Sequence, residues 1–191
     1  LALRKILRDS IRIEALKIEG NVANDSIRSK LVILDSLQKD KYVLGGVFHS
    51  LEKVFQFKFL ENEVILNYAP WTTPPDNSLQ FTSRGIRARN FSITNINEMI
   101  ALETSNDEDS TVSILFKDLN LQNITKLVEG ATPVDGLANG DVNMMASKSG
   151  AFNTSLTIKD LDILDHPWGD LSLALGKTSA GPLNIDLRLE S

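Results

Sequence analysis

The sequence predicts an all-β fold, a long meandering antiparallel sheet accompanied by one or two short helices. Apolar and polar residues alternate over residues 152–159 and 171–175, and most strictly over 183–190, which is the period of two shown by strands with one buried and one wet face. Turn-forming residues precede these runs at 149–150 and separate them at 165–169 and 179–182, so consecutive strands are expected to pair as antiparallel neighbours. Aromatic residues make up only 6% of the chain, and the aliphatic content favours sheets.

The rest of the chain shows the same alternation less cleanly. The apolar side of the pattern switches after Ile13 and again after Ala88, which predicts a β-bulge at each point. We expect the further strands at residues 10–19, 27–35, 41–49, 53–60, 63–68, 78–82, 86–94, 98–104, 111–118 and 136–146.

Five other segments depart from strand periodicity. Residues 1–9 and 120–128 carry apolar side chains at helical spacing, which predicts two short helices. The proline-rich stretch 70–77 is expected to be a loop, because proline is excluded from central strands. The acidic stretch 106–110 is also expected to be a loop. The segment 165–169, Asp-His-Pro-Trp-Gly, is expected to be a turn.

Length and composition indicate a globular β module. With 191 residues, 42% of them hydrophobic, the chain is long enough to bury a core. We expect a single β module over 1–191, with possible sub-modules 1–105 and 106–191, excised from a longer protein. No run approaches the roughly 20 apolar residues that span a bilayer, so a membrane anchor is expected outside this sequence.

Charge argues against nucleic-acid binding. The formal net charge is −5, and a nucleic-acid protein concentrates basic side chains on one face to displace phosphate counterions. Only Arg84, Arg87 and Arg89 cluster, and alternating solvent-facing positions in a strand explain that cluster.

The sequence predicts no catalytic, metal or cofactor site. His49 and His166 are the only imidazoles and there is no cysteine, so a nucleophilic triad and a thiolate metal site are not expected. The acidic stretch 106–110 lacks the glycine and distal glutamate of a calcium-binding loop. We therefore expect a protein that is not an enzyme and that needs no cofactor.

The one-sided strands raise the question of what covers their apolar face. Two short helices cannot cover a sheet of about a dozen strands, so the sheet must close into a barrel, pack as a sandwich or fold into an open U-shaped trough. An open face would accept lipid acyl chains or partner strands, whereas in a sandwich the same side chains form an ordinary core. The candidate groove-lining residues are Phe55, Phe57, Phe59, Val142, Met144, Phe152, Leu156, Ile158, Leu171, Leu173, Leu175, Leu183, Ile185, Leu187 and Leu189.

Several segments, in order, resemble a known family. They are residues 64–71 (Val-Ile-Leu-Asn-Tyr-Ala-Pro-Trp), 75–81 (Pro-Asp-Asn-Ser-Leu-Gln-Phe), 86–93, 112–121, 136–142 (Gly-Leu-Ala-Asn-Gly-Asp-Val), 151–163 and 168–173 (Trp-Gly-Asp-Leu-Ser-Leu). In this order and spacing the chain, from about residue 10 to its end, resembles the TamB family of translocation and assembly proteins, AsmA-like bridge proteins, in the form found in Bacteroidetes-type bacteria.

This resemblance implies a segment of a very long periplasmic protein of a Gram-negative bacterium, anchored in the inner membrane. It implies a sheet bent into a U-shaped trough, a β-taco, that works with a TamA-type outer-membrane barrel in phospholipid transport, outer-membrane protein assembly and protein secretion. The expected partners are phospholipid acyl chains or unfolded outer-membrane protein strands. The alternative is a closed β-sandwich interaction module that binds partner strands by β-augmentation.

Overall fold

The computed structural model confirms the all-β antiparallel meander. It describes residues 2–3, 6–8, 11–13, 15–52, 54–83, 85–105, 111–127, 132–145 and 150–191. Within these ranges the chain forms strands and a single helix, α1 (Gln122–Thr125). Arg84 and the acidic stretch 106–110 lie outside the described residues.

The first sheet contains eight strands, all paired antiparallel. Seven follow one another in the order β1-β4-β5-β6-β7-β9-β10, and β8 pairs with β7 beside that path. Their bounds are β1 Ala2–Leu3, β4 Ala15–Ala23, β5 Ser26–Leu34, β6 Asp40–Leu51, β7 Val54–Leu66, β8 Ala69–Trp71, β9 Ser78–Thr82 and β10 Gly85–Arg89.

The second sheet is a seven-stranded meander in chain order, from β11 to β17. Its strands from β13 to β17 are 8 to 12 residues long, so the cross-strand ladders in this part are long. Their bounds are β11 Phe91–Asn95, β12 Glu98–Thr104, β13 Thr111–Asn120, β14 Val134–Met145, β15 Phe152–Ile163, β16 His166–Lys177 and β17 Leu183–Glu190; β2 (Ile6–Arg8) and β3 (Ile11–Ile13) form a separate pair.

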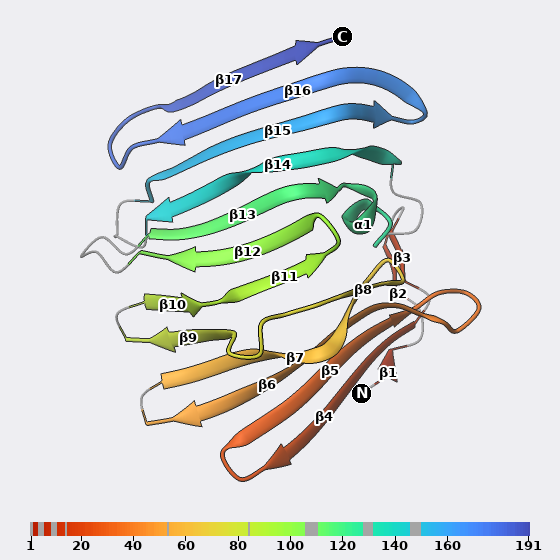
Figure 1. Ribbon diagram of the computed structural model, residues 1–191, viewed down its shortest axis with the longest axis vertical. Coiled ribbons are helices and arrows are strands. Elements are labelled where there is room, and N and C mark those ends of the chain that lie inside the picture. The colour runs from red at the N-terminus through yellow and green to blue at the C-terminus, as the bar shows by residue number, and fades with distance from the viewer. Residues whose placement is uncertain are drawn as a thin grey trace.

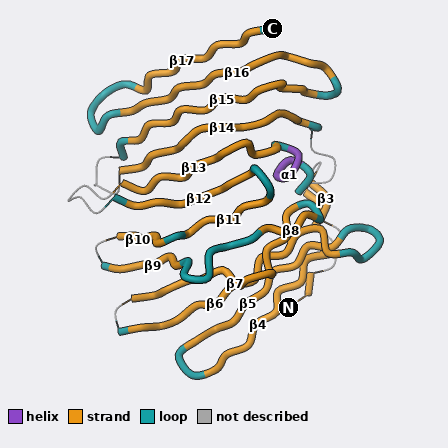
Figure 2. The backbone as a smooth tube through the Cα atoms, viewed as in Figure 1, coloured by secondary structure: helices purple, strands orange, loops and turns teal. Residues whose placement is uncertain are grey.

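The two sheets follow one another along the long axis of the molecule (Figure 1), and the loops lie at the strand ends with α1 beside β13 and β14 (Figure 2). A bridge joins them, in which Thr72 N–H donates to the Thr94 carbonyl at 2.8 Å and Thr94 N–H donates to the Thr72 carbonyl at 2.9 Å. Ala88 N–H also donates to Thr104 Oγ1 at 3.0 Å. The sheets are therefore joined edge to edge, and the chain passes from one to the other at Asn90.

The side chain of Asn77 completes the pairing of β7 between β8 and β9. Its Oδ1 accepts from Phe59 N–H at 2.8 Å, and its Nδ2 donates to the carbonyls of Phe59 and Pro74 at 3.1 and 2.7 Å. Asn77 is almost fully buried. A side-chain amide thus replaces a strand partner where the proline-rich loop leaves the sheet.

Two related bulges interrupt the second sheet. Asp118 in β13 and Asp160 in β15 each follow a lysine and precede a leucine, and both adopt positive φ angles of 44° and 50°. The N–H of Asp118 donates to Asn139 Oδ1, and the N–H of Asp160 donates to Asp170 Oδ1, each at 2.9 Å. Bulges bend the strand that carries them and increase its twist, so these bulges curve the sheet.

Two predicted helices differ from the structure. The helix over residues 1–9 is wrong, because the described part of that segment forms β1, which pairs with β4, and β2, which pairs with β3. A helix of nine residues has little stability of its own, and here the backbone finds strand partners instead. The helix over 120–128 is shorter than predicted, since α1 is one turn that links β13 to β14; Val128 and Gly130 lie outside the described residues.

The predicted bulges after Ile13 and Ala88 are also wrong. β3 ends at Ile13 and β4 begins at Ala15 in another sheet, while β10 ends at Arg89 and β11 begins the second sheet. In both places the alternation breaks because the chain changes sheets.

Three boundaries also moved. The strands predicted at 53–60 and 63–68 are one strand, β7 (Val54–Leu66), with a register shift, and β8 (Ala69–Trp71) beside it extends into the start of the proline-rich stretch. The turn expected at 165–169 consists of Leu164 and Asp165, both with positive φ, as in a type I′ hairpin. Leucine is unusual at a position with positive φ, so the turn was predicted to begin one residue too late, at Asp165 rather than at Leu164.

Gly140 provides a test of the backbone geometry. Its φ is +151°, and a Cβ there would overlap the Ser155 carbonyl oxygen on β15, whereas a Cβ at Gly176 would meet nothing within 4 Å. We expect Gly140→Ala to lower the free energy of unfolding by about 2–4 kcal/mol and Gly176→Ala to change it by less than about 1 kcal/mol. Urea denaturation measures both, and equal effects of the two substitutions would contradict this register.

Candidate functional site

Cross-strand register places the predicted lining residues of the second sheet on one face. Leu156 lies opposite Leu173, which lies opposite Leu187, and directly opposed residues of antiparallel strands share a face. The members of the predicted set that the register aligns in this way are Val142, Met144, Phe152, Leu156, Ile158, Leu171, Leu173, Leu175, Leu183, Ile185, Leu187 and Leu189. Polar residues such as Ser172 and Asn184 occupy the opposite face.

Aromatic side chains continue this face into the first sheet. Phe55, Phe57 and Phe59 alternate along β7 and so lie on the same side of it. The ring of Phe59 stacks on Phe91 of β11 with centroids 4.9 Å apart, and Phe57 meets Phe91 edge-on at 6.0 Å. Phe91 lies opposite Leu102 in the second sheet. One continuous surface therefore crosses the junction, and we call it the apolar face.

Further residues of the apolar face were missing from the predicted set. The alternation in the predicted strands 98–104 and 111–118 was the signal that identifies several of them. By register they are Val22, Ile27, Phe48, Phe81, Phe91, Ile93, Ile100, Leu102, Val112, Ile114 and Phe116.

The apolar face is buried at its centre and exposed towards both ends. Val64 and Trp71 are each 1% exposed and pack with residues of β11, β13, β14 and β15. At the far ends Val22 is 71% exposed and Ile185 is 63% exposed. Side chains of the curved sheet therefore cover the centre, and the two ends present apolar surface to solvent.

A hollow of about 160 Å³ opens in the apolar face near the junction. Its apolar lining comes from Phe59, Phe91, Ile93, Ile100 and Leu102, among others. This volume suits a short apolar group rather than a whole lipid.

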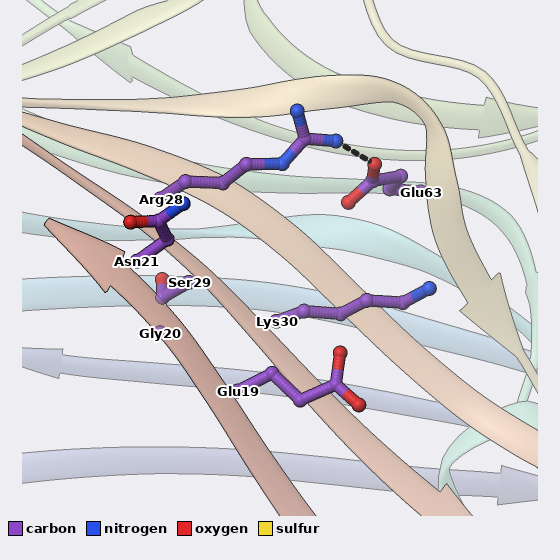
Figure 3. A pocket seen from close by; sticks show the side chains of 7 residues that line it. All are labelled: Glu19, Gly20, Asn21, Arg28, Ser29, Lys30 and Glu63. Carbon is purple, nitrogen blue, oxygen red and sulfur yellow. Dashed lines mark hydrogen bonds and ion pairs between the residues drawn. The ribbon is translucent and has the colours of Figure 1, made fainter. Parts of the chain in front are cut away.

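The opposite face of the first sheet carries a polar hollow of about 340 Å³ (Figure 3). Arg28 and Glu63 form an ion pair across it, with Glu19 and Lys30 beside them. A Cβ at Gly45 would overlap the Glu63 side chain, so this glycine makes room for the pair. The hollow has matched positive and negative charges and is open to solvent.

The described residues were also searched for histidines and acidic side chains that could act together in acid–base catalysis or hold a metal ion. His49 lies in β6, whereas His166 begins β16, where its Nδ1 lies 2.7 Å from the Leu164 carbonyl oxygen. The described residues contain no group of three or more His, Asp or Glu side chains placed to hold a metal ion. None of the described helices is long and apolar enough to cross a membrane.

A scan against models of protein families finds none that matches this chain, and searches of curated proteins and of solved structures find no match. The structure alone therefore supports the fold and the geometry of the apolar face. The resemblance to the TamB family stays a prediction.

Burial makes Tyr42 a pH-sensitive element of the first sheet. Its hydroxyl is buried without a hydrogen-bond partner among the described residues, and this burial, aided by nearby Tyr68, raises the pKa of Tyr42 to about 12 from 10.0. The folded state therefore favours the neutral phenol. Below pH 10 both states are neutral and stability is unaffected; between pH 10 and 12 the unfolded chain ionises first and stability falls.

We expect that loss to be on the order of 2 kcal/mol. The Tyr42→Phe variant has no phenol to ionise at this position and should not show this pH-dependent loss of stability. The stability of the variant relative to wild type should therefore rise from pH 9 to pH 12. Denaturation series at several pH values measure it. A constant difference across the range would show that Tyr42 does not titrate as its burial requires.

The exposure gradient along the apolar face has a direct consequence for stability. Ile158 is 8% exposed and Ile185 is 63% exposed, although both face the same side. Ile158→Ala should cost about 2–4 kcal/mol, because it leaves a cavity, and Ile185→Ala should cost less than about 1 kcal/mol. Thermal or urea unfolding compares them, and a large loss at Ile185 would mean that this end of the face is covered.

Proposed function

We propose that this chain is a non-enzymatic, TamB-like segment whose apolar face binds the acyl chains of phospholipid during transport between membranes, in support of outer-membrane protein assembly. The observation that carries the proposal is the continuity of the apolar face across both sheets, with large aliphatic side chains exposed at each end. Contiguous exposed apolar surface of this kind usually marks an interaction site.

The free energy of burying an acyl chain is large enough for the apolar face to hold a lipid during transport. Burying one methylene contributes about 0.8 kcal/mol, so a chain of about 16 carbons gains on the order of 13 kcal/mol before ordering costs are subtracted. The gain is non-directional, because aliphatic rows such as Leu156–Leu173–Leu187 offer no polar group that fixes a ligand. A lipid chain held in this way can slide.

The cellular setting belongs to the same proposal. We base it on the resemblance of residues 64–71, 136–142 and 168–173 to that family. The proposal includes a periplasmic location, an inner-membrane anchor in the full-length protein and a TamA-type outer-membrane barrel as partner.

A second candidate is the capture of unfolded barrel strands by β-augmentation. In the described structure β17 pairs with β16 along one side, and all eight of its residues are exposed. A strand added at β17 would gain main-chain hydrogen bonds and would place alternate side chains on the apolar face.

Matched substitutions on the two faces test lipid binding. Leu173→Asp and Leu187→Asp place a carboxylate on the apolar face, and Ser172→Asp and Asn184→Asp place one on the polar face of the same strands. After expression in a Gram-negative bacterium, native mass spectrometry should detect copurified phospholipid on the wild type and on the polar-face variants. The apolar-face variants should lose most of it, because a buried carboxylate opposes acyl-chain contact.

Circular dichroism should show that all four variants remain folded. Lipid-free wild type, or equal lipid content in both groups, would contradict the proposal. A variant that loses a bound unfolded barrel strand but no lipid would favour β-augmentation.

A further inference from the structure

The turns along one side of the molecule carry exposed apolar side chains. Successive turns of an antiparallel meander lie alternately at the two rims formed by the strand ends. One of them, which we call the turn rim, lies on the right in Figure 1 and contains the turns 35–39, 67–68, 96–97, 121–127 and 164–165. Each of these turns has at least one exposed large apolar residue, and these residues are Leu37, Tyr68, Ile96, Ile124, Leu127 and Leu164.

The opposite rim is polar in the turns that the structure describes. Residues 24–25 join β4 to β5 there, and residues 178–182 join β16 to β17; neither turn holds a large apolar side chain. An exposed aliphatic residue beside this rim is Leu51, which ends β6. Among the described turns, those that expose large apolar residues therefore share one rim.

Three residues of the turn rim also adopt a conformation that their side chains disfavour. The φ angles of Tyr68, Ile96 and Leu164 are 68°, 52° and 59°. Glycine and asparagine are usual in this left-handed region, and a β-branched residue such as isoleucine is an outlier there. At the opposite rim Asn24, with a φ of 50°, follows the usual preference. Backbone strain costs free energy and is concentrated at functional sites, so the apolar side chains of these turns call for a role other than folding.

Hydrogen bonds tie neighbouring turns of the turn rim together. Each joins a residue in or beside one turn to a residue in or beside the next: Tyr68 Oη donates to Asp35 Oδ2 at 2.8 Å, Asn95 Nδ2 donates to the Pro70 carbonyl at 2.6 Å, and Asn123 Nδ2 donates to Glu98 Oε2 at 2.7 Å. The Leu164 N–H donates to the Pro133 carbonyl at 3.0 Å, just before β14. Polar groups thus bond to one another along the rim, and apolar side chains are left facing the solvent.

Charge and residue type indicate what this rim contacts. The charged residues within its turns are two acidic and two basic ones, Asp35, Asp165, Lys39 and Lys126, so the rim has no excess of either sign. Trp168, shortly after the last turn, is also exposed, and Trp and Tyr are enriched at the headgroup level of membranes. A protein–protein interface needs a closely packed patch, whereas a lipid surface accepts separate apolar side chains from separate turns.

We infer that the turn rim docks onto the surface of a zwitterionic phospholipid bilayer. The three most exposed aliphatic residues of the rim, Leu37, Ile96 and Leu164, enter the bilayer interface, and Tyr68 lies at the headgroup level. Burial of these side chains in lipid offsets the strain of the left-handed turns. The inference goes beyond the proposed function, because it places a whole bilayer at the strand ends, whereas the proposed function places single acyl chains on the apolar face.

The test replaces two strained apolar residues with the residue type that their backbone favours. Ile96→Asn and Leu164→Asn remove an apolar side chain and suit a positive φ, so both variants should unfold at the wild-type temperature or above. Cosedimentation of the whole chain with phosphatidylcholine vesicles measures the partition coefficient. We expect each variant to lower it about fivefold and the double variant to lower it about twentyfold. The matched control is Leu51→Asn at the opposite rim, which should change it less than about twofold.

A wild type that does not sediment with the vesicles, rim variants that sediment as the wild type does, or an equal loss for Leu51→Asn would each overturn the inference. Rim variants that keep vesicle binding but lose a specific protein partner would also overturn it, because the rim would then be a protein contact. Copurified phospholipid, measured by native mass spectrometry, tests the proposed function separately. The rim variants should retain that lipid, and a wild type that binds vesicles but carries no lipid would overturn the proposed function alone.

Discussion

The structure depends on one constraint: its two antiparallel sheets share a long apolar face, and the described residues provide no layer of helices to cover it. The alternation of apolar and polar residues with a period of two places the apolar side chains of each strand on one face. The cross-strand pairing of Leu156, Leu173 and Leu187 shows that neighbouring strands place them on the same face. Burial of the apolar face is the main favourable contribution to folding. At its centre this face is covered by side chains of the two sheets themselves, such as Val64, Trp71 and Leu119.

That curvature arises from local backbone features. The left-handed aspartates Asp118 and Asp160, each held by a side chain of the next strand, interrupt the register at related positions in β13 and β15. At the junction, the amide of Asn77 replaces a missing strand partner. These polar contacts keep the backbone satisfied where the sheet bends, and bending brings Val64, Trp71 and Leu119 into one buried cluster.

Much of this architecture could be predicted from alternation alone. The strands at the C-terminal end, the hairpin connectivity and the shared face of their aliphatic residues follow directly from the period of two. What could not be predicted depends on pairing with other strands: Ala2–Leu3 and Ile6–Arg8 form strands because β4 and β3 offer them partners. Leu164 occupies a turn position that its side chain does not signal.

The same distinction applies to the candidate site. Phe55, Phe57 and Phe59 were identifiable by their spacing, but their contact with Phe91 depends on the way the two sheets join. The positive φ angles of Ile96 and Leu164 in the turn rim could not be found from the sequence, because a backbone conformation that the side chain disfavours is imposed by the folded surroundings.

Photo-crosslinking with a fatty acid that carries a diazirine in its tail tests the central claim most directly, because it reports which face of the sheet the acyl chain touches. The account predicts, by peptide mass spectrometry, labels on apolar-face residues such as Leu173 and Ile185 and none on their neighbours Ser172 and Asn184. Labelling of the polar face, or labelling without preference for either face, would contradict it.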